Sequence, residues 1–378
     1  MRTLWATAFR PFFLAASSFA AVALGVWILA LSGVPISGVD VPWHAHELLY
    51  GFFAAVLCGF LLTAAKNWAS LPAVSGARLQ VLFAVWVLGR VAALGPVPAL
   101  RFVSVLTPVL LFAYLLPYLL AQGQQGNRVF LVAVALFALG DGVSLLPSTP
   151  AWAPFLNRSN GLWLGLHVAQ WLIVLMSAKT MPLFVERAVG APVRTWPLVE
   201  RASSWSVLAA LVADFLDAPA PVLVAASLVA AVANGVRLWG FRGLQGLRSR
   251  LLFLVVLGYG CLVAGYAGLA WVSWTGAPLS QVVHVFTAGA ISAMVYSIMS
   301  RIALGHTGRP IAVSRVLLAG YFLVVLGAGV RIAAGAAPGE HFIALLQVAG
   351  GSLALAWGLY AAWSAPFLLA PRADGKPG

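Results

Sequence analysis

Long apolar runs, separated by short polar segments, follow one another along almost the whole chain. Each run is continuous, unlike the alternating pattern of a strand in an outer-membrane barrel. A helix needs about 20 apolar residues to cross the hydrocarbon core of a bilayer. Scanning for that length predicts twelve transmembrane helices: 11–32, 46–65, 78–95, 101–120, 128–146, 160–180, 203–217, 220–237, 250–272, 280–301, 314–334 and 341–364.

This pattern predicts an all-α fold, a polytopic helix bundle that forms one membrane domain over residues 1–378. The seventh and eighth runs are the weakest, and the turn 217–221 between them leaves a re-entrant hairpin open as an alternative. The first run, 11–31, exceeds the ~7–15-residue core of a signal peptide, so we expect a retained helix. The loop 181–202 carries no nucleotide-binding motif, which argues against an ATP-driven pump.

Composition and charge support the membrane assignment. The chain is 62% hydrophobic and 8% charged, whereas soluble domains carry about 25% charged residues. A net charge of +13 suggests nucleic acid binding in a soluble protein, but here the basic residues stand singly or in small groups between apolar runs. If both termini are cytoplasmic, the outer loops hold only Arg101, Arg158 and Arg331 of the 22 Lys and Arg, and Arg90 lies within the third run. The positive-inside rule therefore predicts cytoplasmic termini and no nucleic acid partner.

The side chains best suited to bind a metal or exchange a proton lie at the outer end of the second run. His44, His46 and Glu47 fall within four positions there, where ionisable groups are costly and usually functional or paired. The predicted topology also places His167, His284 and His341 in the outer half of the membrane, so that only His306 of the six histidines is cytoplasmic. Imidazole is a preferred ligand of copper, zinc and haem iron. The sequence therefore predicts a metal or haem site on the outer side, with His44, His46, His284 and His167 as candidate ligands.

Each histidine also has a simpler interpretation. His44 and His46 are two apart, so on a regular helix they point about 200° apart. Only an irregular first turn near Pro42 would let both bind one ion; otherwise one ligates and the other forms a hydrogen bond or binds a second centre. His167 is either a ligand or a core histidine hydrogen-bonded across helices. We expect His341 to be an interfacial anchor.

The small residues 287–293 after His284 would let a neighbouring helix or a flat porphyrin approach the backbone closely. We interpret Cys58 and Cys261 as buried core residues, and Met294 and Met299 as structural filler more readily than axial ligands.

Charged residues suggest two further features. Glu47, Arg90 and Asp141 are predicted near the outer ends of three helices, where we expect them to pair with one another. Such a network would hold haem propionates, line a proton path or serve as a structural ion pair, and the residues do not discriminate. At the inner end of the tenth run, Gly305, Gly308 and Pro310 predict a tight turn. There Arg301, His306 and Arg309 form a cationic patch suited to an anion.

Several stretches occur together in one order along the chain. They are Phe9-Arg10-Pro11-Phe12-Phe13, Trp43-His44-Ala45-His46-Glu47 with Gly51-Phe52 and Gly59-Phe60-Leu61-Leu62-Thr63-Ala64, Asn67-Trp68, Leu88-Gly89-Arg90, His284-x4-Gly289-Ala290, and Arg301-x2-Leu304-Gly305-His306-Thr307-Gly308-Arg309-Pro310. These stretches and the twelve-helix plan resemble the NnrS family, haem- and copper-containing membrane proteins of bacterial nitric oxide metabolism. One stretch departs from the family pattern: Lys179 stands where the family has Arg, and the two differ in hydrogen-bonding geometry.

The resemblance implies a haem- and copper-binding protein of the bacterial inner membrane that responds to nitric oxide or protects against it. Whether nitric oxide is turned over, and hence whether the protein is an enzyme, stays open. An oxidase or nitric oxide reductase core needs more late histidines than His284. A secondary transporter of a small anion or metal complex is the alternative, although no paired helix interruption appears in the two halves.

Overall fold

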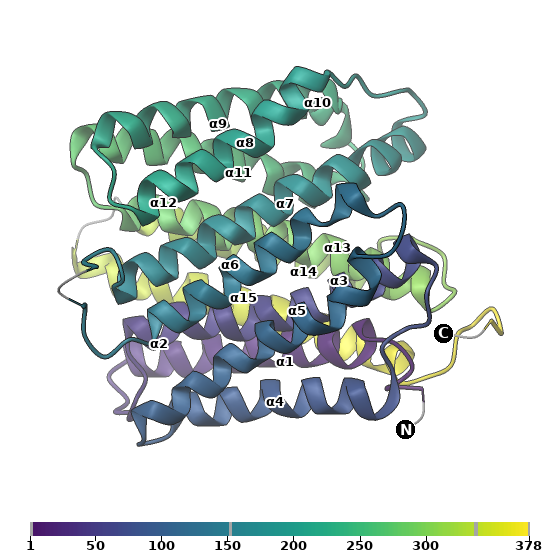
Figure 1. Cartoon of the computed structure of the whole chain (residues 1–378), viewed down its shortest axis with the longest axis horizontal. Coiled ribbons are helices and arrows are strands. Elements are labelled where there is room, and N and C mark those ends of the chain that lie inside the picture. The colour runs from purple at the N-terminus through teal and green to yellow at the C-terminus, as the bar shows by residue number, and fades with distance from the viewer. Residues whose placement is uncertain (1–2, 151–152, 336–338, 377–378) are drawn as a thin grey trace. The chain divides into compact units, whose positions relative to one another are not determined.

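The computed structural model describes all residues except 1–2, 151–152, 336–338 and 377–378, and its described residues form helices with no strand (Figure 1). Among them, eleven helices are long and apolar enough to cross a membrane. The predicted all-α, polytopic fold is therefore confirmed. The first elements are α1 (Phe9–Leu31), α2 (Val41–His46), η1 (Glu47–Phe53), α3 (Ala54–Ala69), α4 (Gly76–Leu94), η2 (Pro98–Val105), α5 (Leu106–Leu119), η3 (Gln125–Asn127) and α6 (Val129–Ser144). The remaining elements are α7 (Arg158–Val189), α8 (Pro197–Phe215), α9 (Ala220–Gly240), α10 (Gly243–Gly246), α11 (Phe253–Thr275), α12 (Ser280–His284), η4 (Val285–Ile291), α13 (Ser292–His306), α14 (Arg315–Ala334) and α15 (Gly339–Leu368).

The helices group into two compact units. Unit 1 consists of Met1–Gly165, Met299–Ile311 and Leu353–Gly378, and unit 2 of Leu166–Ile298 and Ala312–Ser352. The boundaries within α7, α13 and α15 mean that these helices contribute residues to both units. The single membrane domain over 1–378 stays a prediction.

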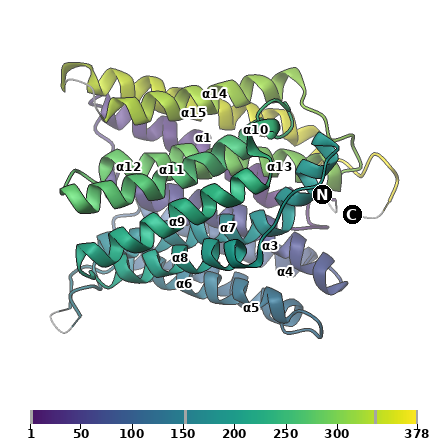
Figure 2. The same cartoon turned by 90° about the horizontal axis from the view of Figure 1, so that it is seen from above.

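Unit 1 is held together by close helix packing at small residues. A side chain at Gly59 of α3 would come within 2.8 Å of the Phe13 ring of α1, so glycine lets these two helices approach. A side chain at Gly140 of α6 would lie 3.0 Å from the Gly161 carbonyl of α7. α5 packs against both α3 and α6, and its place beside α6 is visible in Figure 2. Lipid tails are as apolar as the helix surfaces, so the hydrophobic effect does not drive these helices together. Small residues let them pack closely instead, and van der Waals contact stabilises the pairs.

In unit 2, α8, α9 and α11 lie side by side (Figure 1). α11 also packs on η4, where Gly265 accommodates the Phe286 ring, and Gly258 of α11 accommodates Met294 of α13. The small residues of η4, such as Ala290, are buried in this contact. Packing against α11 therefore accounts for the run 287–293 noted in the sequence.

Two features of the structure bear on the predicted number of crossings: the composition of α8 and the contact between α1 and α15. α8 is not among the eleven apolar helices, since it carries Glu200, Arg201 and Asp214. Its 19 residues nevertheless extend about 28 Å, close to the bilayer core. Arg10 at the start of α1 donates hydrogen bonds to the carbonyls of Leu368 (2.8 Å) and Ala370 (2.7 Å) at the end of α15. The start of α1 and the end of α15 thus lie together at one end of unit 1 (Figure 1), the arrangement that an even number of crossings produces. Twelve crossings, which would include α8, and the cytoplasmic side of the termini both stay predictions.

Several helix bounds differ from the sequence prediction, and three of them show why. The second helix begins at Val41 rather than 46, because the Asp40 side chain caps it. α7 continues to Val189 rather than 180, so most of the first half of the predicted loop 181–202 is helical. Met181 and Val185 are buried on this extension. α8 begins at Pro197 rather than 203. An apolar-run scan misses such extensions because an amphipathic turn beyond the membrane has no continuous apolar run.

Candidate functional site

His44 and His46 lie on a regular α-helical segment and face different neighbours. The Asp40 carboxylate accepts a hydrogen bond from the backbone N–H of Trp43 (2.7 Å), which starts α2 as an ordinary helix. The His44 ring stacks on Trp27 of α1, with ring centroids 4.7 Å apart and planes at 17°. The His46 ring points instead towards Asp141 of α6. The irregular first turn that would converge the two imidazoles is therefore absent, and that part of the interpretation was wrong.

His46 is bonded through both ring nitrogens. Its Nδ1 lies 2.9 Å from Glu47 Oε1, and its Nε2 lies 2.9 Å from Asp141 Oδ1. Because ionised carboxylates only accept hydrogen bonds, both nitrogens must donate while both carboxylates are charged, which makes the ring an imidazolium. An imidazolium has no lone pair for a metal ion. Ligation by His46 stays a prediction, and it requires one of these bonds to break.

The other bonds close a buried ring of five side chains. Arg90 Nη1 donates to both carboxylate oxygens of Glu47 (2.8 Å each), and its Nη2 donates to Ser104 Oγ (2.7 Å). The Ser104 hydroxyl donates in turn to Asp141 Oδ2 (3.0 Å). All five residues are buried, and their charges balance when His46 is protonated. The predicted pairing of Glu47 with Arg90 is confirmed, while Asp141 pairs with His46 and reaches Arg90 through Ser104.

Two glycines allow this ring to form. A side chain at Gly89 of α4 would lie 3.1 Å from the Ser104 Cα, so glycine brings η2 close enough for Ser104 to reach Arg90. A side chain at Gly51 would lie 2.5 Å from Arg90 Nη1. Sequence reasoning selected Arg90 but missed Ser104, whose only signal was a polar residue at the edge of an apolar run.

A π-helical segment begins immediately after His46 and another after His284. η1 covers Glu47–Phe53 in unit 1, and η4 covers Val285–Ile291 in unit 2. A glycine lies five residues after each histidine, Gly51 and Gly289. π-helical turns are rare and occur frequently at functional sites, because they displace the helix ladder and redirect side chains. Both histidine motifs thus occur at the same kind of backbone irregularity.

In the second of these segments, neighbouring groups meet the displaced backbone. Gln170 of α7 donates from Nε2 to the Phe286 carbonyl at 3.5 Å, and the Thr287 hydroxyl donates to the Val283 carbonyl at 3.0 Å. Gly289 faces Cys261 of α11, whose Sγ would lie 3.0 Å from a side chain there. Since His284 belongs to unit 2 while His44 and His46 belong to unit 1, their convergence on one metal stays a prediction.

His167 is hydrogen-bonded across helices in unit 2. Its Nε2 lies 3.1 Å from Asp214 Oδ2 of α8, and its Nδ1 lies 3.4 Å from the Tyr266 hydroxyl of α11. The ring is 1% exposed. This is the second of the two interpretations that the sequence left open, and ligation by His167 stays a prediction. By contrast, His341 lies 3.6 Å from Glu340 and is 69% exposed, as expected for an interfacial anchor.

The turn after α13 is covered by the C-terminal segment of the chain. Gly308 adopts φ +73°, which ends the helix as predicted. Arg372 Nη1 donates to the His306 carbonyl (2.8 Å), and the Ala373 N–H donates to the Thr307 carbonyl (2.9 Å). The Asp374 carboxylate lies against Gly308. The cationic turn therefore has an acidic neighbour from its own chain, which the sequence did not predict.

The three predicted residues of this turn have separate surroundings. The His306 ring lies against Phe9 of α1 with centroids 5.5 Å apart. The Arg309 guanidinium lies 5.1 Å from the Phe367 ring centroid. Arg301 is buried. Hydrogen bonds from the Arg372 guanidinium lower the pKa of the Asp374 carboxyl to about 2, and the same contact raises the pKa of Arg372.

Among the described residues, no group of three or more His, Cys, Asp and Glu side chains is arranged to hold a metal ion. Compared with known proteins, the chain matches a family model described as NnrS protein over residues 3–372, nearly its whole length. A search of the curated proteins finds no significant match.

Proposed function

The chain belongs to the NnrS family of nitric-oxide-related membrane proteins, and on this premise we propose that it is a haem- and copper-binding protein of the bacterial inner membrane that protects its cell against nitric oxide. The observation that carries the proposal is the pairing of histidine with π-helix in two separate helices. His46 precedes η1 and His284 precedes η4 directly. Because π-helical turns are costly and often functional, they support these two helix ends as the cofactor-binding regions.

The histidines suit haem better than copper. Haem iron needs only one or two axial side chains, so a single imidazole on a helix is sufficient. The candidate axial ligands are His44, His46, His284 and His167; His46 would have to give up a bond to a carboxylate, and His167 a bond to Asp214 or Tyr266. When bound, haem iron supplies a coordination position for nitric oxide. The role assigned to the protein is to hold the iron through imidazole in an apolar, water-poor environment.

For copper the fit is weaker. Protein copper sites combine several imidazole or sulfur ligands. Cys58 is buried in α3 and Cys261 faces Gly289, and the described residues hold no group of three such ligands. Copper therefore remains in the proposal through the family alone, and no chemical step is assigned to it.

The test is the optical spectrum and metal content of the purified full-length protein. Pyridine haemochrome absorbance measures haem, and elemental analysis measures copper and iron. We expect a Soret band that shifts when nitric oxide is added to the reduced protein. A protein without a Soret band and without copper, after expression with both supplied, would refute the proposal. In that case a transporter of a small anion or a metal complex becomes the better interpretation.

A further inference from the structure

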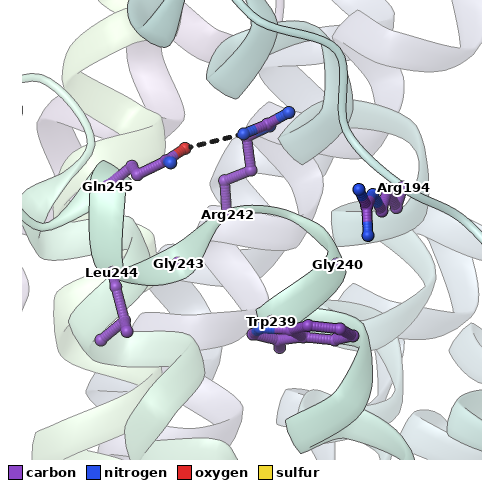
Figure 3. Close-up of a pocket in the computed structure, with 7 residues that line it drawn as sticks. All are labelled: Arg194, Trp239, Gly240, Arg242, Gly243, Leu244 and Gln245. Atoms are coloured by element: carbon purple, nitrogen blue, oxygen red, sulfur yellow. Dashed lines mark hydrogen bonds between the residues drawn. The ribbon is translucent and has the colours of Figure 1, made fainter.

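A cavity of about 230 Å³ lies in unit 2, at the end of α9 that is predicted to be cytoplasmic (Figure 3). Arg194, Arg242 and Trp239 line it together with Leu244 and Gln245. Figure 3 shows the two arginines at its upper edge and the indole of Trp239 lying below them. Two guanidinium groups beside exposed apolar side chains form an unusual combination, since the first attracts an anion and the second attracts hydrocarbon.

The backbone around the cavity holds Arg194 in place. The Arg194 N–H donates to the Gly240 carbonyl at 2.9 Å, which ties the segment 190–196 to the end of α9. A side chain at Gly240 would lie 2.5 Å from the Arg194 carbonyl, so this approach requires glycine. Trp196 from the same segment stacks on Trp239, with centroids 5.8 Å apart and planes at 7°. The side chain of Arg194 is exposed and makes no hydrogen bond within the described structure.

Arg242 is held in a strained position. Its φ of +56° is left-handed, a conformation that favours glycine. Its Nε donates to the Pro192 carbonyl (2.7 Å), and its Nη1 lies 3.3 Å from Gln245 Oε1 (Figure 3). These bonds leave Nη2 to meet a ligand. Backbone strain of this kind is found where a side chain must be presented in a defined direction.

This end of unit 2 also carries a surplus of positive charge. Glu200 is bonded to Arg237, and Glu186 accepts a hydrogen bond from the Val193 N–H. The other arginines of the two neighbouring segments form no ion pair in the described part of the chain. They are Arg187, Arg194, Arg201, Arg242, Arg248 and Arg250.

The apolar residues beside the cavity indicate where its ligand comes from. Trp239 is 64% exposed and Leu244 is 78% exposed. Tryptophan is enriched where a helix meets the headgroup layer, and basic pockets on the cytoplasmic side bind anionic headgroups. We propose that this cavity binds the phosphate of an anionic phospholipid, with Arg194 and Arg242 contacting the phosphate oxygens and Trp239 and Leu244 contacting the lipid chain.

The test is native mass spectrometry of the full-length protein, released from nanodiscs of equal parts phosphatidylglycerol and phosphatidylcholine. We expect the wild-type protein to retain phosphatidylglycerol selectively. The double variant Arg194→Gln/Arg242→Gln should lower the fraction carrying this lipid about tenfold. The matched control Arg187→Gln/Arg250→Gln removes the same charge outside the cavity and should lower it less than about twofold. Arg194→Gln alone, which breaks no side-chain hydrogen bond, should still reduce retention while the protein stays monodisperse.

Three outcomes would overturn the proposal. Equal losses in the two double variants would mean that the general charge of the surface attracts lipid. Equal retention of phosphatidylcholine by the wild-type protein would remove the role of the anionic headgroup. Displacement of all bound phosphatidylglycerol by excess inorganic phosphate would assign the cavity to a free anion instead of a lipid. None of these readouts depends on haem or copper.

Discussion

The segments after His46 and after His284 have the same backbone conformation but different surroundings. Both are seven-residue π-helical stretches inside a transmembrane helix. Around η1, the displaced backbone lies beside a closed ring of charged groups, including Glu47 and Arg90. Around η4, the neighbours are the uncharged Gln170, Gly265 and Cys261. The same local irregularity thus occurs once beside charged and once beside uncharged neighbours.

The difference indicates separate roles for the two histidines. His46 is fixed by two carboxylates, so its ring holds η1 in position before any ligand arrives. η4 packs on α11 through small side chains, which allow two helices to meet closely. We therefore expect the first segment to be rigid because its charges are bonded. We expect the position of the second segment to depend on close packing of small side chains. Substitutions that change only charge or only side-chain volume should therefore affect the two segments differently.

The largest effect should come from breaking the charged ring. Glu47→Gln removes the carboxylate that pairs directly with Arg90, which is 7% exposed, and leaves one carboxylate against two positive charges while His46 is protonated. Removing one partner of a buried ion pair costs about 3–5 kcal/mol. We expect that loss in the free energy of unfolding, measured by denaturant titration in mixed micelles. Glu340→Gln is the control, since Glu340 is 79% exposed and should change stability by less than about 0.5 kcal/mol. Similar losses for both would show that the ring is not specially stabilising.

A smaller effect should follow from filling the two glycines. Gly51→Ala places a methyl group 2.5 Å from Arg90 Nη1 and 2.8 Å from the Phe19 ring, and should cost about 1–3 kcal/mol. Gly289→Ala meets the Cys261 side chain at 3.0 Å and the His284 carbonyl at 3.9 Å, and the higher helix propensity of alanine offsets part of that strain. We therefore expect a loss below about 1 kcal/mol. Gly25→Ala, with no atom within 4 Å, is the control and should be neutral or stabilising. A larger loss at Gly289 than at Gly51 would reverse the comparison.

Substitutions of the histidines should affect haem content and protein stability to different degrees. His46→Ala breaks two buried hydrogen bonds, so we expect it to lower both haem retention and the unfolding temperature. His44→Ala and His284→Ala should each weaken haem retention at least about tenfold with smaller losses of stability. His341→Ala and His306→Ala should leave metal content near normal. Haem per protein by pyridine haemochrome is the measurement. Full haem content in all three outer variants would assign the site elsewhere, with His167 as the next candidate.

The smallest effect concerns the C-terminal segment, which contrasts an exposed ion pair with the buried ring. The pKa of Asp374 is depressed to about 2 from its ordinary value of 3.8. Its contribution is therefore complete above about pH 4 and is lost as the pH falls through 2. Between pH 5 and 8 we expect no change in protease protection of this segment. Asp374→Asn should increase cleavage near Arg372 across that whole range. Protection that changes between pH 5 and 8 would mean that another group holds the segment.

Most of the fold was predictable because a membrane helix must be apolar over its whole length. The seventh and eighth runs were the least certain because they are short and the turn 217–221 between them suggested a re-entrant hairpin. Two acidic residues of α8 have long-range partners that the sequence does not reveal: Glu200 bonds Arg237, and Asp214 bonds His167. The extension of α7 to Val189 was missed because its apolar residues recur at helical intervals outside the continuous run.

The sequence predicted most residues of the buried ring, but it did not predict which of them bond to each other. A costly charge in the membrane implies a partner, which selected Glu47, Arg90 and Asp141. The partner of Asp141 is His46, 95 positions away in the sequence, and a contact at that distance leaves no local pattern. The π-helical segments and Ser104 were missed for the same reason. The contacts of Gly51 with Arg90 and of Gly289 with Cys261 are likewise long-range, and one sequence does not reveal them.

The bonds between Arg10 and the end of α15 determine when unit 1 can be completed during synthesis. A ribosome delivers helices to the membrane from the N-terminus, so α1 inserts long before Leu368 and Ala370 exist. Until then the Arg10 guanidinium lacks its carbonyl acceptors and must remain hydrated at the headgroup layer. All of unit 2 is translated in this interval. The end of α15 therefore completes the contacts of a helix made much earlier in synthesis, and a chain truncated before α15 lacks the carbonyl acceptors that Leu368 and Ala370 offer to Arg10.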